Sequence, residues 1–154
     1  MDPRPACSAC WHSVRHAGAG SAHPLCYPLN RSYGDSRLSS PVQLAHRIAA
    51  LAAEKAATDI VILDMRDVVS YTDYFVICTG RNPRQTQAIS DAIHERLKGD
   101  DRMLPKRIEG QRQGDWVLLD YLDAVAHVFT PEARAYYRLE SLWGQVPSET
   151  YAAG

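Results

Sequence analysis

The sequence lacks long hydrophobic runs and a strong net charge. No apolar stretch approaches the roughly 18 residues that a membrane-spanning helix needs, and the first residues lack the apolar segment of a secretory signal. The formal net charge at pH 7 is −1, so no global basic field would attract nucleic acid or an anionic membrane. We therefore expect neither a membrane protein nor direct, sequence-specific recognition of nucleic acid.

Cysteine is also scarce, and its placement argues against a disulfide framework. Of the four cysteines, three lie before residue 41, and the fourth, Cys78, lies in an apolar strand pattern where we expect it to be buried. Small secreted domains instead carry many paired cysteines. This usage favours a reducing compartment, and a cytoplasmic location fits it.

The N-terminal part of the chain lacks hydrophobic periodicity, and Pro, Gly, Ser and His dominate it. Helical and strand patterns begin after Ser40. We therefore expect a disordered tail over 1–40, a domain over 41–146 and a C-terminal tail over 147–154. The N-terminal tail contains Ser and Arg and few acidic residues, which leaves organellar targeting as an alternative. Its Pro and Gly residues oppose the amphipathic helix that a targeting peptide needs.

Cysteine and histidine residues of this tail have a spacing that resembles zinc sites. The stretches "CSAC" and "HPLC" supply two ligand pairs, formed by Cys7, Cys10, His23 and Cys26. Apolar residues that would pack around a zinc knuckle are sparse there, and this favours an unstructured segment. A zinc-binding scaffold that uses the tail therefore stays an alternative.

Hydrophobic periodicity in the domain predicts alternating helices and strands. We expect a helix over 41–57, strands over 59–65 and 74–79, a helix over 83–98, a short strand within 103–110, strands over 115–121 and 124–130, and a helix over 131–143. Proline begins each helix, Gly99 is expected to stop the second, and Pro105 places the short strand at a sheet edge. The order αββαβββα predicts an α/β domain in which a mixed sheet of about five strands packs against helices.

The domain contains no familiar catalytic motif. A P-loop needs Gly-Lys-Ser/Thr, a dinucleotide site needs three clustered glycines and a nucleophile elbow needs Gly-x-Ser-x-Gly, and the sequence has none of these. Asp120 and Asp123 have opposite strand parity and are not expected to converge. His127 is interpreted as a hydrogen-bonded, half-buried strand histidine. We therefore expect no catalytic residue and no cofactor.

The strand that contains Trp116 is apolar on both faces. Alternation places Trp116, Leu118 and Asp120 on one face, and Val117, Leu119 and Tyr121 on the other. A tryptophan beside acidic residues is typical of an interface hot spot for a basic partner. If helices cover both faces of the sheet, however, Trp116 is simply a core residue. The residues alone do not separate these two interpretations.

Several stretches together carry a resemblance to a known family. They are "DIVILDM", "SYTDYFVICTG" with the following helix "RQTQAISDAI", the pair Glu109-Gly110, and "DWVLLDYLDAVAHVFTPEARAYYRLESLW". Over residues 41–144 the chain resembles the ribosomal silencing factors, also called the Iojap-like family. The resemblance implies a nucleotidyltransferase-like fold without that activity. It also implies binding to protein L-fourteen of the large ribosomal subunit, which blocks joining of the small subunit and lowers translation when nutrients are scarce.

The resemblance also implies where the partner binds. It places the contact on Trp116, Leu118 and Asp120, with Asp123 nearby. The family usually has glycine where this chain has Leu122, so we expect a strained or remodelled hairpin turn. Such proteins are often dimeric, and "AYYRLESLW" holds more apolar side chains than one helical face can bury, which predicts a homodimer.

A nucleotidyltransferase enzyme is the rival function on the same scaffold. That chemistry needs a Gly-Ser turn followed by paired carboxylates that hold two metal ions. Here the turn is Gly80-Arg81-Asn82, and the domain has no Asp-x-Asp or Asp-x-Glu pair. This departure disfavours the enzyme.

Overall fold

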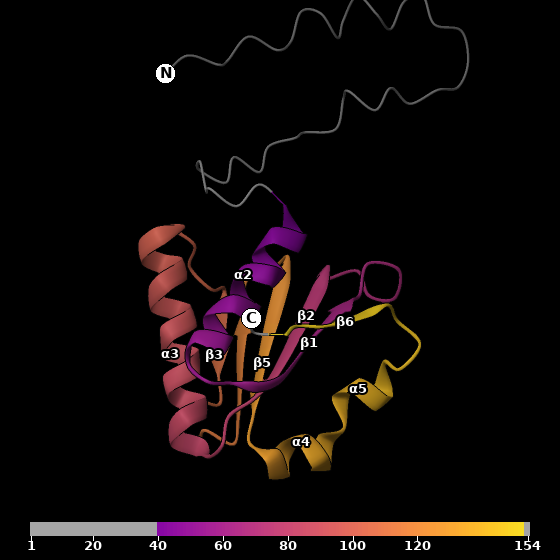
Figure 1. Cartoon of the computed structure of the whole chain (residues 1–154). Helices are drawn as coiled ribbons and strands as arrows, with labels where there is room; N and C mark the ends of the chain where they lie inside the picture. The colour runs from indigo at the N-terminus through magenta and orange to yellow at the C-terminus, as the bar shows by residue number, and fades with distance from the viewer. Residues whose placement is uncertain (1–39, 153–154) are drawn as a thin grey trace, which may run out of the picture. The chain divides into compact units, whose positions relative to one another are not determined.

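The computed structural model describes residues 40–152 (Figure 1). The elements are α2 (Pro41–Glu54), β1 (Thr58–Asp64), β2 (Tyr74–Thr79), α3 (Pro83–Asp100), β3 (Arg107–Glu109), β4 (Trp116–Asp120), β5 (Ala124–Phe129), α4 (Pro131–Tyr137), α5 (Leu139–Leu142) and β6 (Ser148–Thr150). The strands form one six-stranded sheet in the order β3-β4-β5-β2-β1-β6. Among the strands of residues 40–152, only β2 and β5 pair in parallel, so the predicted α/β class with a mixed sheet is confirmed.

The two long helices begin where the sequence predicts. The side chain of Ser40 accepts a hydrogen bond from the Gln43 amide, and Asn82 does the same for Gln85. A proline follows each of these caps, where its missing N–H costs nothing. The helices α2 and α3 contact each other and lie on the same face of the sheet (Figure 1).

The centre of the sheet consists of β2 and β5, in which every residue is buried. Their continuous apolar sequences are typical of strands that are covered on both faces. The first face packs against α2 and α3 in one hydrophobic cluster, and the second face forms a separate, smaller cluster. In the described part of the chain, the helices that contribute to this second cluster are the short α4 and α5 after β5, and Trp116 and Leu118 at its margin stay partly exposed.

The prediction of one continuous helix over 131–143 is wrong, because this segment forms two short helices, α4 and α5. Arg138 has a left-handed backbone (φ 46°, ψ 48°), which ends α4 and separates it from the single turn of α5. The break lets Glu140 turn back toward Arg134, a pair six residues apart that a straight helix would not bring together. The amphipathic pattern alone cannot reveal such an ion pair.

Two further boundaries also differ from expectation. Helix α3 continues through Gly99 to Asp100, and the left-handed residue is instead Arg102. The segment 147–154, which we expected to be a tail, contributes strand β6, which pairs with β1 and gives the sheet a sixth strand. All three β6 residues are exposed, so they lack the apolar alternation by which strands are predicted. The short strand β3 lies at the sheet edge, as Pro105 predicted.

The N-terminal tail, with Cys7, Cys10, His23 and Cys26, lies outside the described residues. Within the described part of the chain, no helix combines the length and the apolar character that crossing a bilayer requires.

Candidate partner-binding site

Trp116 lies at the start of β4 on the second face of the sheet and is half-buried. Its indole ring stacks on Phe129 from the neighbouring strand, with 5.1 Å between the ring centroids. The ring of Tyr137 from α4 lies 4.7 Å away. The indole packs on the core through Phe129 and is also partly open to solvent. Trp116 therefore combines features of a core residue and of a surface anchor.

His127 on β5 fixes the orientation of this indole. The Trp116 Nε1–H group donates a hydrogen bond of 3.2 Å to His127 Nδ1. That bond requires an unprotonated Nδ1, so the proton of the neutral ring is on Nε2, which is buried and has no hydrogen-bond partner among the described residues. The histidine is 5% exposed, and burial lowers its pKa to about 4. The predicted hydrogen-bonded histidine is confirmed, although it is more deeply buried than expected.

The low pKa of His127 predicts a specific loss of stability in acid. In the unfolded chain the imidazole binds a proton below about pH 6.5, whereas the folded protein resists protonation until about pH 4. The stabilisation is complete above pH 6.5 and is lost as the pH falls toward 4. Compared with His127→Gln, the wild-type free energy of unfolding should fall by an extra ~3 kcal/mol across this window. The free energy of unfolding of both proteins is measured by denaturant titration at several pH values. If it falls equally with pH in the wild type and in His127→Gln, the low pKa of His127 is wrong.

The other predicted site residues extend along the same strand. Trp116, Leu118 and Asp120 share one face of β4, as alternation requires, and all three are half-buried. At about 3.3 Å per residue, Asp120 lies roughly 13 Å from Trp116 along the strand. Asp123 lies beyond the end of β4, and its carbonyl oxygen accepts hydrogen bonds from the amides of Asp73 and Tyr74. The four residues therefore form a strip, and not a convergent cluster.

The hairpin turn shows how a leucine replaces glycine. Leu122 has a φ of 72°, the left-handed conformation that side chains disfavour. One carboxylate oxygen of Asp120 accepts the Leu122 amide at 2.8 Å, which stabilises the turn. Asp120 thus has a structural contact in addition to the partner contact that the sequence suggests.

Glu109 and Gly110 lie beside Trp116 at the end of β3. Gly110 has a φ of 80°, and a Cβ added there would lie 1.9 Å from the Trp116 carbonyl oxygen. Only glycine permits this close approach of the two chain segments. Gly110 of the pair that the sequence singles out therefore lets the backbone pass close to the tryptophan.

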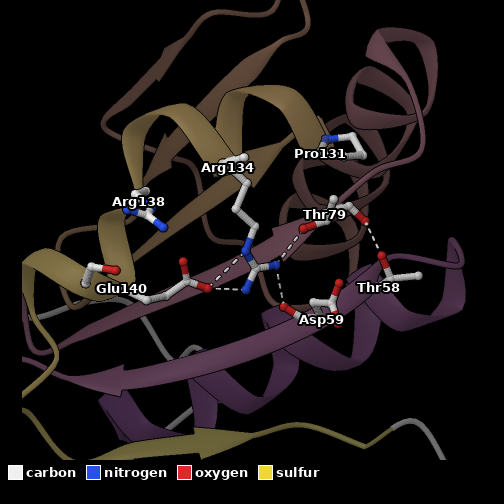
Figure 2. Close-up of a pocket in the computed structure, with 9 residues that line it drawn as sticks. Thr58, Asp59, Thr79, Pro131, Arg134, Arg138 and Glu140 are labelled. Carbon is white, nitrogen blue, oxygen red and sulfur yellow. Dashed lines mark hydrogen bonds and ion pairs between the residues drawn. The ribbon is translucent and has the colours of Figure 1, made fainter.

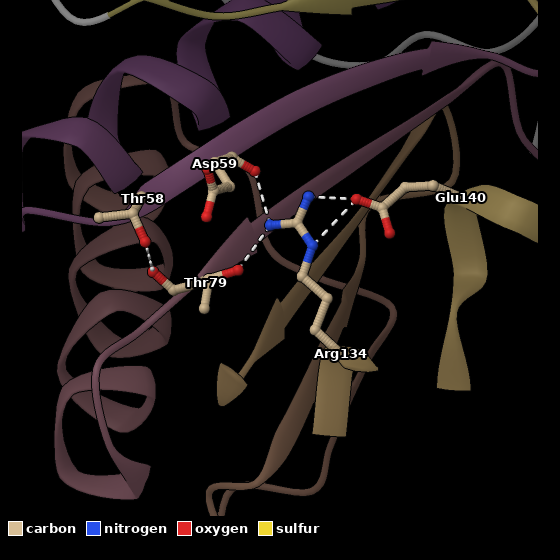
Figure 3. Close-up of polar contacts among 5 residues, drawn as sticks. All are labelled: Thr58, Asp59, Thr79, Arg134 and Glu140. Carbon is tan, nitrogen blue, oxygen red and sulfur yellow. Dashed lines mark hydrogen bonds and ion pairs between the residues drawn. The ribbon is translucent and has the colours of Figure 1, made fainter. Parts of the chain in front are cut away.

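Arg134 fixes helix α4 to the sheet. Its guanidinium donates to the Asp59 carbonyl oxygen at 2.7 Å, to the Thr79 hydroxyl, and to Glu140, with Nε 2.9 Å from the carboxylate (Figure 3). We call these four residues the Arg134 network. It lines a cavity of about 390 Å³ with Arg138 at its rim (Figure 2). The network holds α4, and with it Tyr137, against the second face of the sheet.

Loss of the Arg134 network should loosen α4. Arg134→Met leaves the half-buried Glu140 carboxylate without its cation, so the free energy of unfolding should fall by about 1–3 kcal/mol. Amide hydrogen exchange should accelerate across residues 131–142. Arg138→Met is the matched control, because the Arg138 side chain is exposed and makes no hydrogen bond or ion pair within the described part of the chain. Equal effects of the two variants would contradict the network's role.

The comparisons identify the family. The model of the family described as "Ribosomal silencing factor during starvation" matches residues 38–153. This chain belongs to the ribosomal silencing factor family. The resemblance inferred from the sequence is therefore confirmed.

Relatives of this ribosomal silencing factor occur in bacteria and in eukaryotic organelles. The chain is 42% identical over 102 residues to the ribosomal silencing factor RsfS of Bacillus subtilis strain 168, covering 66% of this chain and 86% of the relative. It is 31% identical over 129 residues to a mouse protein named mitochondrial assembly of ribosomal large subunit protein 1, covering 75% and 55%. A crystal structure of a protein from Chromobacterium violaceum is similar, with a TM-score of 0.65, 29% identity, and coverage of 75% and 94%.

Two residues of this silencing factor's site escaped sequence reasoning. In the sequence, Tyr137 is one of several apolar residues on a predicted helix, and its tilted ring contact with Trp116 depends on where α4 docks. In the sequence, Arg134 is an ordinary arginine on the surface of a predicted helix. In the structure, only 15% of its side chain is exposed. Its partner Asp59 is 75 residues away in the sequence, so no local signal could have revealed the contact.

The described part of this silencing factor contains no group of three or more His, Cys, Asp or Glu side chains placed to hold a metal ion. Cys78 is buried, as expected, and burial raises the pKa of its thiol to about 12, so it is not a reactive thiolate. The second face presents the aromatic rings of Trp116 and Tyr137 and the carboxylate of Asp120.

Proposed function

We propose that this silencing factor represses translation by binding the large ribosomal subunit through ribosomal protein L-fourteen, on the side that meets the small subunit. A bound protein there blocks subunit joining by occupying space. Membership of the family supports a silencing role. The name of the mouse relative links that protein to the large ribosomal subunit.

The observation that carries the proposal is the half-buried indole of Trp116, which remains partly open to solvent on the incompletely covered face of the sheet. Partly exposed tryptophans that are supported from beneath are typical interface anchors, since little conformational entropy is lost when they bind. Asp115 directly precedes Trp116 in the sequence, and Asp120 lies at the other end of β4 on the same face. Their charge favours a basic partner surface, and ribosomal proteins offer basic surfaces because they bind RNA.

The mechanism needs no catalysis. Steric exclusion depends on the affinity and the position of the bound protein, so a domain without a catalytic site is sufficient. The working compartment that we propose is the bacterial cytoplasm, where large subunits are free between rounds of translation.

Purified subunits test the proposal directly. The protein should sediment with isolated large subunits and not with small subunits, and it should reduce the yield of joined ribosomes when both subunits are mixed. Equal sedimentation with both subunits, or normal joining at saturating protein, would contradict the proposed function.

We also expect self-association through the C-terminal helices. Tyr136 is 81% exposed, Tyr137 52% and Leu142 70%, a large apolar exposure for two short helices. Sedimentation velocity should show a concentration-dependent dimer. Tyr136→Ser combined with Leu142→Ser should shift the protein toward monomer, whereas Leu104→Ser, at a residue 66% exposed elsewhere, should not. A wild-type monomer at high concentration would contradict the dimer.

A further inference from the structure

A hollow of about 420 Å³ lies directly beside Trp116. Its walls differ sharply in chemistry. Trp116, Leu118 and Tyr137 supply aromatic and aliphatic surface, and Glu109 and Asp115 supply carboxylates. Neither lysine nor arginine is among the lining residues.

The aromatic wall is built to stay in place. The Trp116 and Tyr137 ring centroids are 4.7 Å apart, with 47° between the ring planes. The indole is held by its hydrogen bond to His127 and by stacking on Phe129. A preorganised aromatic face attracts cations through its quadrupole, and the attraction grows when the cation loses water.

The carboxylates of the hollow are available for an external partner. Among the described residues, the Asp115 side chain makes no hydrogen bond or ion pair, and its residue is exposed. Glu109 has only Arg107, at 3.5 Å, and both side chains are at least 60% exposed. Exposed pairs of this kind contribute little, so a better-placed cation can replace Arg107.

We propose that this hollow receives one arginine side chain of the basic protein partner. Arginine suits the walls better than lysine, since its planar guanidinium stacks on an aromatic ring while its N–H groups donate sideways to carboxylates. The aliphatic stem of the arginine packs along Leu118. The inference rests on the proposed function for the partner's identity, but the chemistry of the hollow is testable without a ribosome.

The first experiment titrates the full chain with N-acetyl-arginine amide and follows the indole N–H signal of Trp116 by NMR, assigned through Trp116→Phe. The signal should shift in a saturable way with arginine. It should shift at least fivefold less with the citrulline derivative, which has nearly the same shape and no charge. Equal responses to the two compounds, or a larger response to the lysine derivative, would overturn the proposal.

The second experiment measures binding to purified large subunits at several salt concentrations. Glu109→Gln combined with Asp115→Asn should weaken binding at least tenfold and flatten its salt dependence, with an unchanged thermal midpoint. Asp67→Asn combined with Glu95→Gln removes the same charge at exposed sites outside the hollow and should bind like the wild type. Wild-type binding by the Glu109/Asp115 variant would overturn the proposal. If the wild type itself fails to bind, the proposed function falls, and the arginine titration still decides the chemistry of the hollow.

Discussion

Replacing Trp116 by alanine should weaken binding to the large ribosomal subunit by about 30-fold or more, equivalent to about 2 kcal/mol, while the domain stays folded. The side chain is half-buried, so its removal should lower the free energy of unfolding by about 1–3 kcal/mol. That is less than the ~3–5 kcal/mol typical of a fully buried tryptophan. Both quantities are measured on one preparation, by subunit co-sedimentation and by denaturant unfolding.

Leu104→Ala is the matched control for Trp116→Ala. Leu104 is also a large apolar residue, but it is 66% exposed and lies outside the proposed surface. The Leu104→Ala variant should bind large subunits and unfold like the wild type. If Trp116→Ala is unfolded, Trp116 is a core residue and not a partner anchor. If the variant is folded and binds normally, the partner surface lies elsewhere.

The second large effect is expected at Gly110. A methyl group at this position would lie 1.9 Å from the Trp116 carbonyl oxygen, and the backbone already has a φ of 80°. The clash and the left-handed strain should together lower the free energy of unfolding of Gly110→Ala by about 3 kcal/mol or more. Because β4 must move to relieve the clash, the Trp116 indole N–H signal should shift as well.

Gly99→Ala is a control that should change the free energy of unfolding in the opposite direction. Gly99 lies within α3, and nothing lies within 4 Å of an added Cβ. Alanine at such a helical position should raise the free energy of unfolding by about 0.5–1 kcal/mol. A Gly110→Ala variant as stable as the wild type would show that β3 and β4 can separate without cost.

Local patterns predicted most of the fold because most elements carry local signals. Proline after a capping side chain marked the helix starts, and continuous apolar runs marked the central strands. The short connection between β4 and β5 also fixes the register, which pairs Trp116 with Phe129 and Leu118 with His127. The diagonal contact between Trp116 and His127 follows from that register.

The candidate site was less predictable because it depends on contacts between distant segments. Whether Trp116 is core or surface depends on how far α4 and α5 cover the second face, and the break at Arg138 decides that. Strand β6 was missed since its pairing uses the backbone and its side chains are all exposed. The family resemblance supplied the proposed partner surface, and the supporting residues Tyr137 and Arg134 came only from the structure.

The two outer strands of the sheet have a consequence for recognition. Both β3 and β6 are three residues long and exposed or nearly so, and they occupy the hydrogen-bonding edges of β4 and β1. Because β3 already pairs with residues 118–120 of β4, a partner strand cannot pair with that part of the tryptophan strand, a mode in which main-chain contacts tolerate many sequences. On the proposed surface, recognition would then depend on side chains of the sheet face, so we expect single substitutions there to change partner choice while the fold is retained.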